Sequence, residues 1–320
     1  MFDEEGHAAH WSPTSKKTTQ KAYGLWLAYL LRAGKLDPGE PPAARASQNN
    51  LQAYLHTFRG NKPTSTANRL RDMYEALRVM CPRADLDPLR RLVRRLQAVA
   101  RKQERVRPNM VSTDELYTAG LARMTRIAQT AYEKRDVKAV RFGDGLLMAM
   151  LACKPIRLRN IIETRVGVNL ARVGDIYVLQ FAPADTKNGQ PIRAQLPGSL
   201  TPFIDDWLTK YRPVLLRGRA SDALWISSYR QPMAAATLTA RFYMATEQEL
   251  GVRMSPHRVR HCLATSVALG LPEKARMLPP LLDHKSDATA RKYYVMADKL
   301  ATSEVYLTML ERRRRQVGED

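Results

Sequence analysis

Imidazole, guanidinium and phenol side chains lie close together in the stretch between Ser255 and Tyr294. This stretch reads SPHRVRHCLATSVALGLPEKARMLPPLLDHKSDATARKYY. Pro256 suits the first turn of a helix and Ser255 suits its N-cap, so that His257 and Arg260 are expected on one helical face. A guanidinium and an imidazole on one face can bind a single anion. Together with the tyrosines at the end of the stretch, they indicate phosphoryl transfer to a phenol.

The same stretch resembles the catalytic domain of the tyrosine recombinases, also called the phage integrase family. One box of that family reads H-x-x-R-H, which matches PHRVRH here. Another reads L-G-H, with the nucleophilic tyrosine nine residues after its histidine. In this chain His284 follows Leu-Leu-Asp, with Asp283 where the family has glycine, and nine residues later comes Tyr293. The resemblance therefore implies Tyr293, rather than Tyr294, as the nucleophile.

Two further basic residues match family positions upstream. The first family box is a small turn, an arginine and a short helix, and PIRLRN aligns Arg157 with that arginine, with Asn160 where glutamate is usual. Arg157 lies four residues before the apolar Ile161 and should face inward, whereas Arg159 turns away. The family also carries a catalytic lysine in a hairpin turn, typically within T-K-x-G, and this corresponds to Lys187.

The resemblance implies a full catalytic set and a mechanism. The implied catalytic residues are Arg157, Lys187, His257, Arg260, His284 and Tyr293. A phenol is almost fully protonated at neutral pH, so its attack needs nearby cations or a proton acceptor. In the implied mechanism the arginines bind the phosphate oxygens, the histidines hydrogen-bond or accept the phenol proton, and the lysine protonates the leaving 5′-oxygen. The resulting 3′-phosphotyrosyl link is reversed by a 5′-hydroxyl, so we expect neither ATP nor a metal cofactor. His261 is expected to hydrogen-bond in the core instead.

The composition indicates a polyanionic partner. The 320 residues carry a formal net charge of +21, with a pI near 10.2, and are numerous enough for two domains. No apolar run is long enough to span a bilayer, and the acidic start MFDEEGHAAH is unlike a signal peptide. We expect no membrane association and a cytoplasmic, nucleoid-associated protein of a prokaryotic cell. The three cysteines are far apart in the sequence and are expected to be reduced.

Helical periodicity predicts a helical bundle in residues 1–107, the expected core DNA-binding domain. After a polar lead-in of about fifteen residues that is expected to be flexible, helical segments are predicted at about 18–33 and 43–58, from about 65, and from about 87. The last segment should place Leu89, Leu92, Leu96 and Val99 inward. Its outward arginines are Arg90, Arg91, Arg94, Arg95 and Arg101.

A solvated face is the usual meaning of such an arginine-rich helix. Two observations favour contacts with the phosphates of double-stranded DNA instead: the basic linker at 102–110 and the positive charge of the whole chain. The resemblance agrees with this interpretation, because in the family a helical core-binding domain and the catalytic domain form a clamp around DNA.

Residues 108–320 are predicted to form a mainly α domain with a small β-hairpin or sheet, an α+β catalytic domain. A capping-box pattern, Ser-Thr-Asp-Glu, precedes the first helix, and Asn188-Gly189 is a hairpin signal between two strand-like runs. The expected helices span about 113–131, 136–153, 200–211, 234–250 and 273–282, and the expected strands 175–182 and 190–196.

An apolar stripe follows the tyrosine pair in the tail, residues 297–320. Its members are Leu300, Val305, Tyr306, Met309 and Leu310. A lone helix of this length is marginal in water, so the stripe must pack against something. It could pack on its own domain. The resemblance favours exchange with a neighbouring subunit, in a tetramer on two DNA sites.

The sequence therefore favours a site-specific DNA recombinase or integrase, whether of a phage, of a mobile element or for chromosome resolution. A type IB topoisomerase uses nearly the same residues, and a non-catalytic DNA-binding protein could retain the fold. The presence of every expected catalytic residue type argues against the non-catalytic alternative. The short chain and its basic C-terminal extension favour recombination over relaxation of supercoils.

Overall fold

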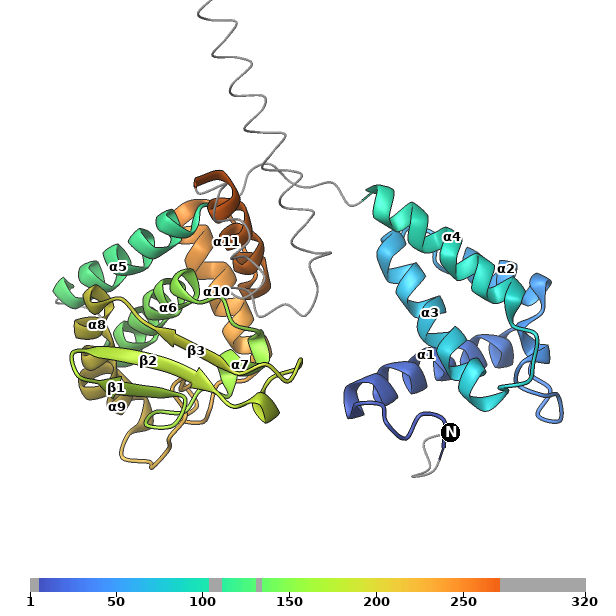
Figure 1. The fold of residues 1–320 in the computed structure, drawn as a ribbon, viewed down its shortest axis with the longest axis horizontal. Helices are drawn as coiled ribbons and strands as arrows, with labels where there is room; N and C mark the ends of the chain where they lie inside the picture. The colour runs from blue at the N-terminus through green and yellow to red at the C-terminus, as the bar shows by residue number, and fades with distance from the viewer. Residues whose placement is uncertain (1–5, 104–110, 131–133, 271–320) are drawn as a thin grey trace, which may run out of the picture. The chain divides into compact units, whose positions relative to one another are not determined.

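The computed structural model describes residues 6–103, 111–130 and 134–270. The chain divides into two compact units, Met1–Pro108 and Asn109–Asp320, and each is described by itself (Figure 1). The predicted helix at 273–282, the tail at 297–320, and both His284 and Tyr293 lie outside the described residues. Among the described helices, none is both long and apolar enough to cross a membrane.

The first unit contains the helices α1 (Pro13–Arg32), α2 (Gln48–His56), α3 (Pro63–Met80) and α4 (Asp87–Gln103). Helix α1 begins five residues earlier than the periodicity predicts, because Ser12 caps it: the Ser12 hydroxyl accepts a hydrogen bond from the Ser15 N–H at 3.2 Å. Ala8, ahead of the helix, is fully buried. The helix therefore begins within the stretch for which the sequence predicts a flexible lead-in.

The core of this unit is built on all four of these helices. Trp26, Leu70 and Leu77 are fully buried. Helix α4 contributes Leu89 to this core, but Val99 is 46% exposed, so its predicted inward position is wrong. A helix turns about 100° per residue, which places residue 99 about 80° from the direction of Leu89 and residue 100 only about 20° from it. Ala100 is accordingly the buried one.

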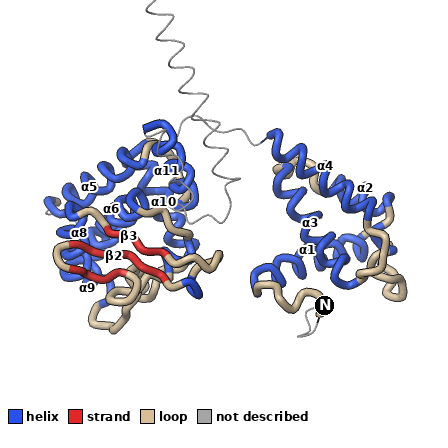
Figure 2. The backbone as a smooth tube through the Cα atoms, in the orientation of Figure 1, coloured by secondary structure: helices blue, strands red, loops and turns tan. Residues whose placement is uncertain are grey.

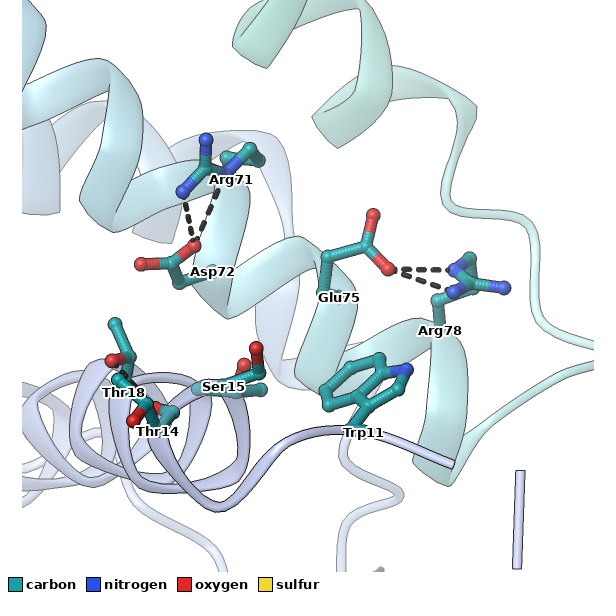
Figure 3. Close-up of a pocket in the computed structure, with 9 residues that line it drawn as sticks. Trp11, Thr14, Ser15, Thr18, Arg71, Asp72, Glu75 and Arg78 are labelled. Carbon is teal, nitrogen blue, oxygen red and sulfur yellow. Dashed lines mark hydrogen bonds and ion pairs between the residues drawn. The ribbon is translucent and has the colours of Figure 1, made fainter. Parts of the chain in front are cut away.

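An open polar pocket lies between the start of α1 and α3 (Figure 3). Trp11 stands at one side of it. Its charged residues are paired along α3: Arg71 with Asp72 at 2.9 Å, and Arg78 with Glu75 at 2.8 Å. The pocket thus presents charges that are already neutralised by a neighbour.

The second unit is organised around α5 (Thr113–Gln129) and α6 (Arg135–Cys153). Ser112 and Glu115 form the predicted capping box at the start of α5, with bonds of 3.0 and 2.7 Å. Every residue from 142 to 152 of α6 is buried, so α6 is the central helix of this core. The two backbones approach closely at Gly120 and Gly145, where a Cβ on Gly120 would lie 2.8 Å from the Gly145 carbonyl oxygen.

A small antiparallel sheet, shown in red in Figure 2, accompanies these helices. The described strands are β1 (Leu170–Val173), β2 (Ile176–Phe181) and β3 (Ile192–Gln195), in that order. The mainly α fold with a small sheet is confirmed, although β1 was not predicted. Strands β2 and β3 pair up to Phe181↔Ile192, which leaves residues 182–191 as the connecting loop.

This connection, called here the lysine loop, is longer than the tight turn at Asn188-Gly189 that the sequence suggests. Pro183–Asp185 forms a 3-10 turn directly after β2, which carries the chain away from the ladder. Gly189 has a φ of +66°, a value that glycine adopts without strain, and the chain returns to β3 after it.

Five further α-helices and a π-helical turn follow in the described part of this unit. They are α7 (Leu158–Ile162), α8 (Thr201–Asp206), a π-helical turn (Trp207–Tyr211), α9 (Arg212–Leu216), α10 (Ala235–Leu250) and α11 (Pro256–Gly270). The predicted helix at 200–211 corresponds to α8 and the π-helical turn, which α9 continues. Helix α10 ends at Gly251, whose φ of +66° suits glycine, and a short segment leads into α11.

Candidate active site

Arg157 stands at the start of α7, where the chain leaves the core helix α6. It is the N-cap residue of α7, with extended backbone angles, and its side chain is partly buried. Its Nη1 donates a hydrogen bond to Asn188 Oδ1 in the lysine loop, at 3.1 Å. Arg159, the competing arginine, is exposed and pairs with Glu163 at 2.9 Å. Of the two arginines, Arg157 is therefore the one directed at the lysine loop.

Helix α11 starts as the sequence predicts. Pro256 is its first residue, and the Ser255 hydroxyl accepts a hydrogen bond from the Arg258 N–H at 3.3 Å. The segment before it is tied back to α10, because the buried Thr246 hydroxyl accepts from the Met254 N–H at 3.1 Å. Both bonds fix where the first turn of α11 lies.

Arg260, one turn into α11, is only 4% exposed. Its Nη1 donates to the Pro155 carbonyl oxygen at 2.5 Å. Pro155 lies two residues before Arg157, the N-cap of α7, so this bond joins the start of α11 to the segment that leads into α7. Two segments that are about a hundred residues apart in the sequence thus meet at one point.

His257 completes this cluster. Its side chain is exposed on one side, yet desolvation by the surrounding chain lowers its pKa below the usual 6.5, and the positive charges of Arg260 and Arg157 lower it further. The uncharged imidazole, which can accept a proton, is therefore favoured over the imidazolium. The half-buried His261 ring packs edge-on against it, with 5.4 Å between the ring centroids.

Lys187 is exposed on the lysine loop. The loop is held beside α7 by Asn160, whose Nδ2 donates to the Asp185 carbonyl oxygen at 3.0 Å. Inside the loop, the Thr186 hydroxyl donates to the Gln190 carbonyl oxygen at 2.8 Å. Arg157, His257 and Arg260 are thus brought together, and Lys187 is carried by a loop that is bonded to the same place.

Three groups in this arrangement were not identified from the sequence. Asn188 served only as a turn signal, although its side chain contacts Arg157. The Pro155 carbonyl that holds Arg260 has no sequence signal at all, because any residue supplies a carbonyl. In the sequence Asn160 stands out only as a departure from the family pattern, whereas in the structure its amide holds the lysine loop.

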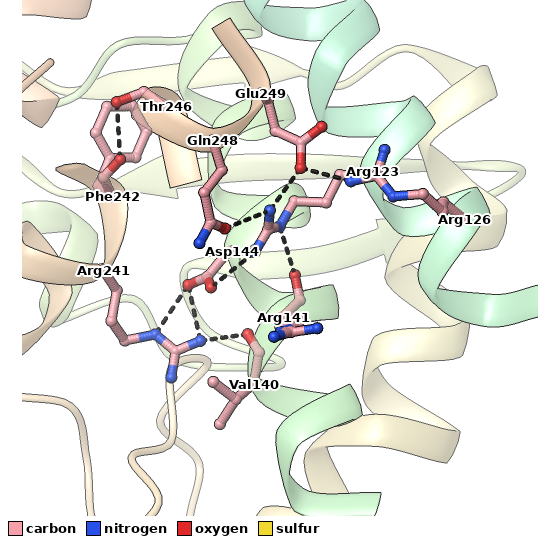
Figure 4. Close-up of polar contacts among 10 residues, drawn as sticks. All are labelled: Arg123, Arg126, Val140, Arg141, Asp144, Arg241, Phe242, Thr246, Gln248 and Glu249. Carbon is pink, nitrogen blue, oxygen red and sulfur yellow. Dashed lines mark hydrogen bonds and ion pairs between the residues drawn. The ribbon is translucent and has the colours of Figure 1, made fainter. Parts of the chain in front are cut away.

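A buried charge network holds α10, and hence the approach to α11, against α5 and α6 (Figure 4). Arg241 Nε donates to Asp144 at 2.8 Å, and Arg123 lies 3.6 Å from the same carboxylate. Arg123 also pairs with Glu249 at 2.6 Å. Burial raises the pKa of Asp144, and the two arginines oppose that shift.

The arginines of α4 in the first unit are all exposed. Arg90 and Arg91 lie near Asp87, at 2.9 and 4.0 Å. Arg94 and Arg95 have no ion-pair partner among the residues that the structure describes. This face of α4 therefore carries positive charge that its own helix only partly neutralises.

The model of the phage integrase family matches residues 124–299, more than half of the chain and the whole region that carries the cluster. The chain belongs to the phage integrase family. It is a site-specific tyrosine recombinase, an enzyme that transfers DNA strands.

Solved structures agree in fold. This recombinase is similar to XerH site-specific recombinase bound to palindromic difH substrate in a post-cleavage complex, with a TM-score of 0.50 and 13% identity over 91% of this chain and 96% of that one. It is also similar to a lambda integrase (75–356) dimer bound to a COC' core site, with a TM-score of 0.50 and 15% identity over 88% of this chain and 92% of that one. A search of the curated proteins found no match.

Proposed function

We propose that this recombinase cleaves and rejoins double-stranded DNA through a 3′-phosphotyrosyl intermediate on Tyr293. The observation that carries the proposal is the cluster of Arg157, His257 and Arg260, which gathers two guanidinium groups and an imidazole of lowered pKa where the start of α11 is bonded to the segment that leads into α7. Such groups bind a phosphodiester and stabilise the charge that develops on its oxygens.

Each residue then has a distinct role. The Tyr293 oxygen attacks phosphorus, and Arg157 and Arg260 bind the non-bridging oxygens of the transition state. His257, together with His284, hydrogen-bonds the phosphate or accepts the phenol proton. Lys187 protonates the 5′-oxygen as its bond to phosphorus breaks. Attack by the 5′-hydroxyl of a second DNA strand reverses these steps, so the energy of the phosphodiester bond is kept and ATP is not needed.

The arginines of α4 are proposed to bind the DNA backbone in the first unit. The residues are Arg90, Arg91, Arg94, Arg95 and Arg101. Their exposure supports the proposal, as does the chain's net charge of +21, since phosphate contacts supply most of the sequence-independent affinity for DNA. The two similar solved structures are both bound to their DNA sites. These contacts would set the position of the first unit along the DNA and its affinity for DNA, rather than its preference for a base sequence.

Self-association on DNA is the further part of the proposal. The apolar stripe in the tail at 297–320 would pass to a neighbouring subunit in a tetramer on two DNA sites. Truncation after Lys299 should leave binding to a single site nearly intact and abolish both the two-duplex complex and recombination. A truncated chain that still recombines at the normal rate would exclude this role, and relaxed supercoils without recombinant products would favour a topoisomerase.

The catalytic proposal is tested by comparing Arg157→Ala with its neighbour variant Arg159→Ala. Arg157→Ala should lower single-turnover cleavage of a nicked DNA site about 100- to 1,000-fold, as removal of one transition-state donor commonly does, and DNA affinity much less. Arg159→Ala loses the same charge from the same helix and should change cleavage less than about threefold. If Arg157→Ala reduced binding and cleavage in equal proportion, or if Arg159→Ala were the slower enzyme, the assignment would be wrong.

A further inference from the structure

Asn160 is buried in α7 and is committed to the lysine loop. It is 1% exposed, and its Nδ2 donates to the Asp185 carbonyl oxygen at 3.0 Å. A buried polar group that loses its hydrogen-bond partner destabilises the fold, so this one bond contributes substantially to holding the loop against α7. A carboxylate at this position could not make the bond, because it has no proton to donate.

The loop is fixed on both sides of Lys187. Asp185 is held by Asn160 on one side, and Asn188 accepts from Arg157 on the other. The two bonds differ in one respect. The Arg157 guanidinium is also the group proposed to bind the phosphate, whereas the Asn160 amide bonds to a main-chain carbonyl and, within the described part of the chain, to no group with a proposed chemical role. The Asn160 bond can therefore persist while DNA binds and reacts.

We propose that Asn160 is a positioning residue that holds the lysine loop so that Lys187 reaches the leaving oxygen. The inference rests on the proposed function of Lys187. In that step the bond from phosphorus to the 5′-oxygen breaks, its electron pair stays on the oxygen, and the Lys187 ammonium supplies the proton. The bond from the Tyr293 oxygen to phosphorus forms at the same time. A displaced loop would leave the phosphate-binding cluster in place and remove only the proton donor.

A change of leaving group isolates this role. In DNA whose scissile 5′-bridging oxygen is replaced by sulfur, the leaving group is a thiolate, which departs without protonation because thiols have a pKa of about 8.5. Loss of the proton donor should thus slow the oxygen substrate and spare the sulfur substrate. The ratio of the two rates is measured on one protein sample, so a partly unfolded variant lowers both rates and leaves the ratio unchanged.

The test variant is Asn160→Asp, which keeps the shape and removes the donor. Asn169→Asp is the matched control, because the buried Asn169 amide likewise donates to a carbonyl, that of Gln180 in β2, at 3.1 Å. Asn160→Asp should cut cleavage of the oxygen substrate at least about tenfold, a partial loss of the roughly 100- to 10,000-fold that a general acid contributes, and that of the sulfur substrate less than about threefold. Asn169→Asp should leave the ratio at the wild-type value. DNA affinity should stay unchanged in both variants.

Lys187→Ala separates the inference from the function on which it rests. If Lys187→Ala is selectively rescued by sulfur and Asn160→Asp slows both substrates equally, the positioning role of Asn160 is wrong while the proposed role of Lys187 stands. If Lys187→Ala also slows both substrates equally, both assignments are overturned. Asn160→Ala is a second variant without an added charge, and it should show the same selective loss as Asn160→Asp.

Discussion

Removal of the Asp144 carboxylate should destabilise the second unit strongly. Asp144 lies at the centre of the network that joins α5, α6 and α10, where it pairs with Arg241 at 2.8 Å and lies 3.6 Å from Arg123. Asp144→Ala leaves both arginines in place. Arg123 keeps Glu249 as a partner, at 2.6 Å, so the charge of Arg241, whose side chain is 16% exposed, is the one that loses its counter-ion.

The magnitude follows from this geometry. Removal of one partner of a buried ion pair costs about 3–5 kcal/mol. Because Arg123 retains a partner and Arg241 keeps some exposure, the lower end of that range, about 3 kcal/mol, is expected. For a unit of roughly 200 residues, each kcal/mol lowers the midpoint of thermal unfolding by about 2–4 °C, so a fall of about 6–12 °C is expected.

The assay is thermal and urea unfolding of the intact chain, with Glu163→Ala as control. Glu163 pairs with Arg159 on the surface, with side chains 45% and 66% exposed, and such pairs contribute about 0–1 kcal/mol. Asp144→Ala should therefore be several times more destabilising than Glu163→Ala. Equal effects, or a loss below about 1 kcal/mol for Asp144→Ala, would refute the view that this network holds α10.

Three further predictions concern packing, pH and salt. Gly120→Ala should lower the free energy of unfolding in urea by about 1–3 kcal/mol, since its Cβ would lie 2.8 Å from a backbone oxygen. Gly24→Ala is the control: a Cβ there would have nothing within 4 Å, so this variant should raise the free energy of unfolding by up to about 1 kcal/mol. Equal effects of the two variants would contradict the close approach of α5 and α6. Because the pKa of His257 is lowered below 6.5 in the folded chain, the unfolded chain binds more protons at this residue, so the free energy of unfolding should fall as the pH drops below about 6.5. His257→Gln should make that fall less steep. A pH profile that is the same in the variant and the wild type would contradict the lowered pKa. Replacement of Arg94 and Arg95 by glutamine should reduce the slope of log affinity against log salt by about 2 if both bind phosphates, and an unchanged slope would contradict those contacts.

Local signals in the sequence are sufficient to predict most of the described helices of the second unit. The capping box at Ser112 is a short-range pattern, and it is present as predicted. Helical periodicity also predicts that Arg157 and Arg159 face different ways, and in the structure the N-cap residue Arg157 bonds to the lysine loop whereas Arg159 is exposed and pairs with Glu163. Ser255 and Pro256 similarly define the start of α11 by local chemistry alone.

Features that depend on tertiary partners could not be read in this way. Strand β1 has the sequence LARV, which becomes a strand only because β2 lies beside it. Asn188-Gly189 is a turn signal in both short and long connections, and Pro183 after β2 decides in favour of the longer one. The bonds from Arg157 to Asn188 and from Arg260 to the Pro155 carbonyl join residues that are distant in the sequence, so no local pattern encodes them.

The most direct test of the account is to trap and map the covalent intermediate. The wild-type chain is incubated with a nicked DNA site from which the short cleaved strand diffuses away, in the presence of EDTA, and the adduct is located by peptide mapping. The account predicts a 3′-phosphotyrosyl link on Tyr293, and no adduct with Tyr293→Phe although that variant still binds the site. An adduct on Tyr294, or bound DNA that never becomes covalently attached, would contradict it.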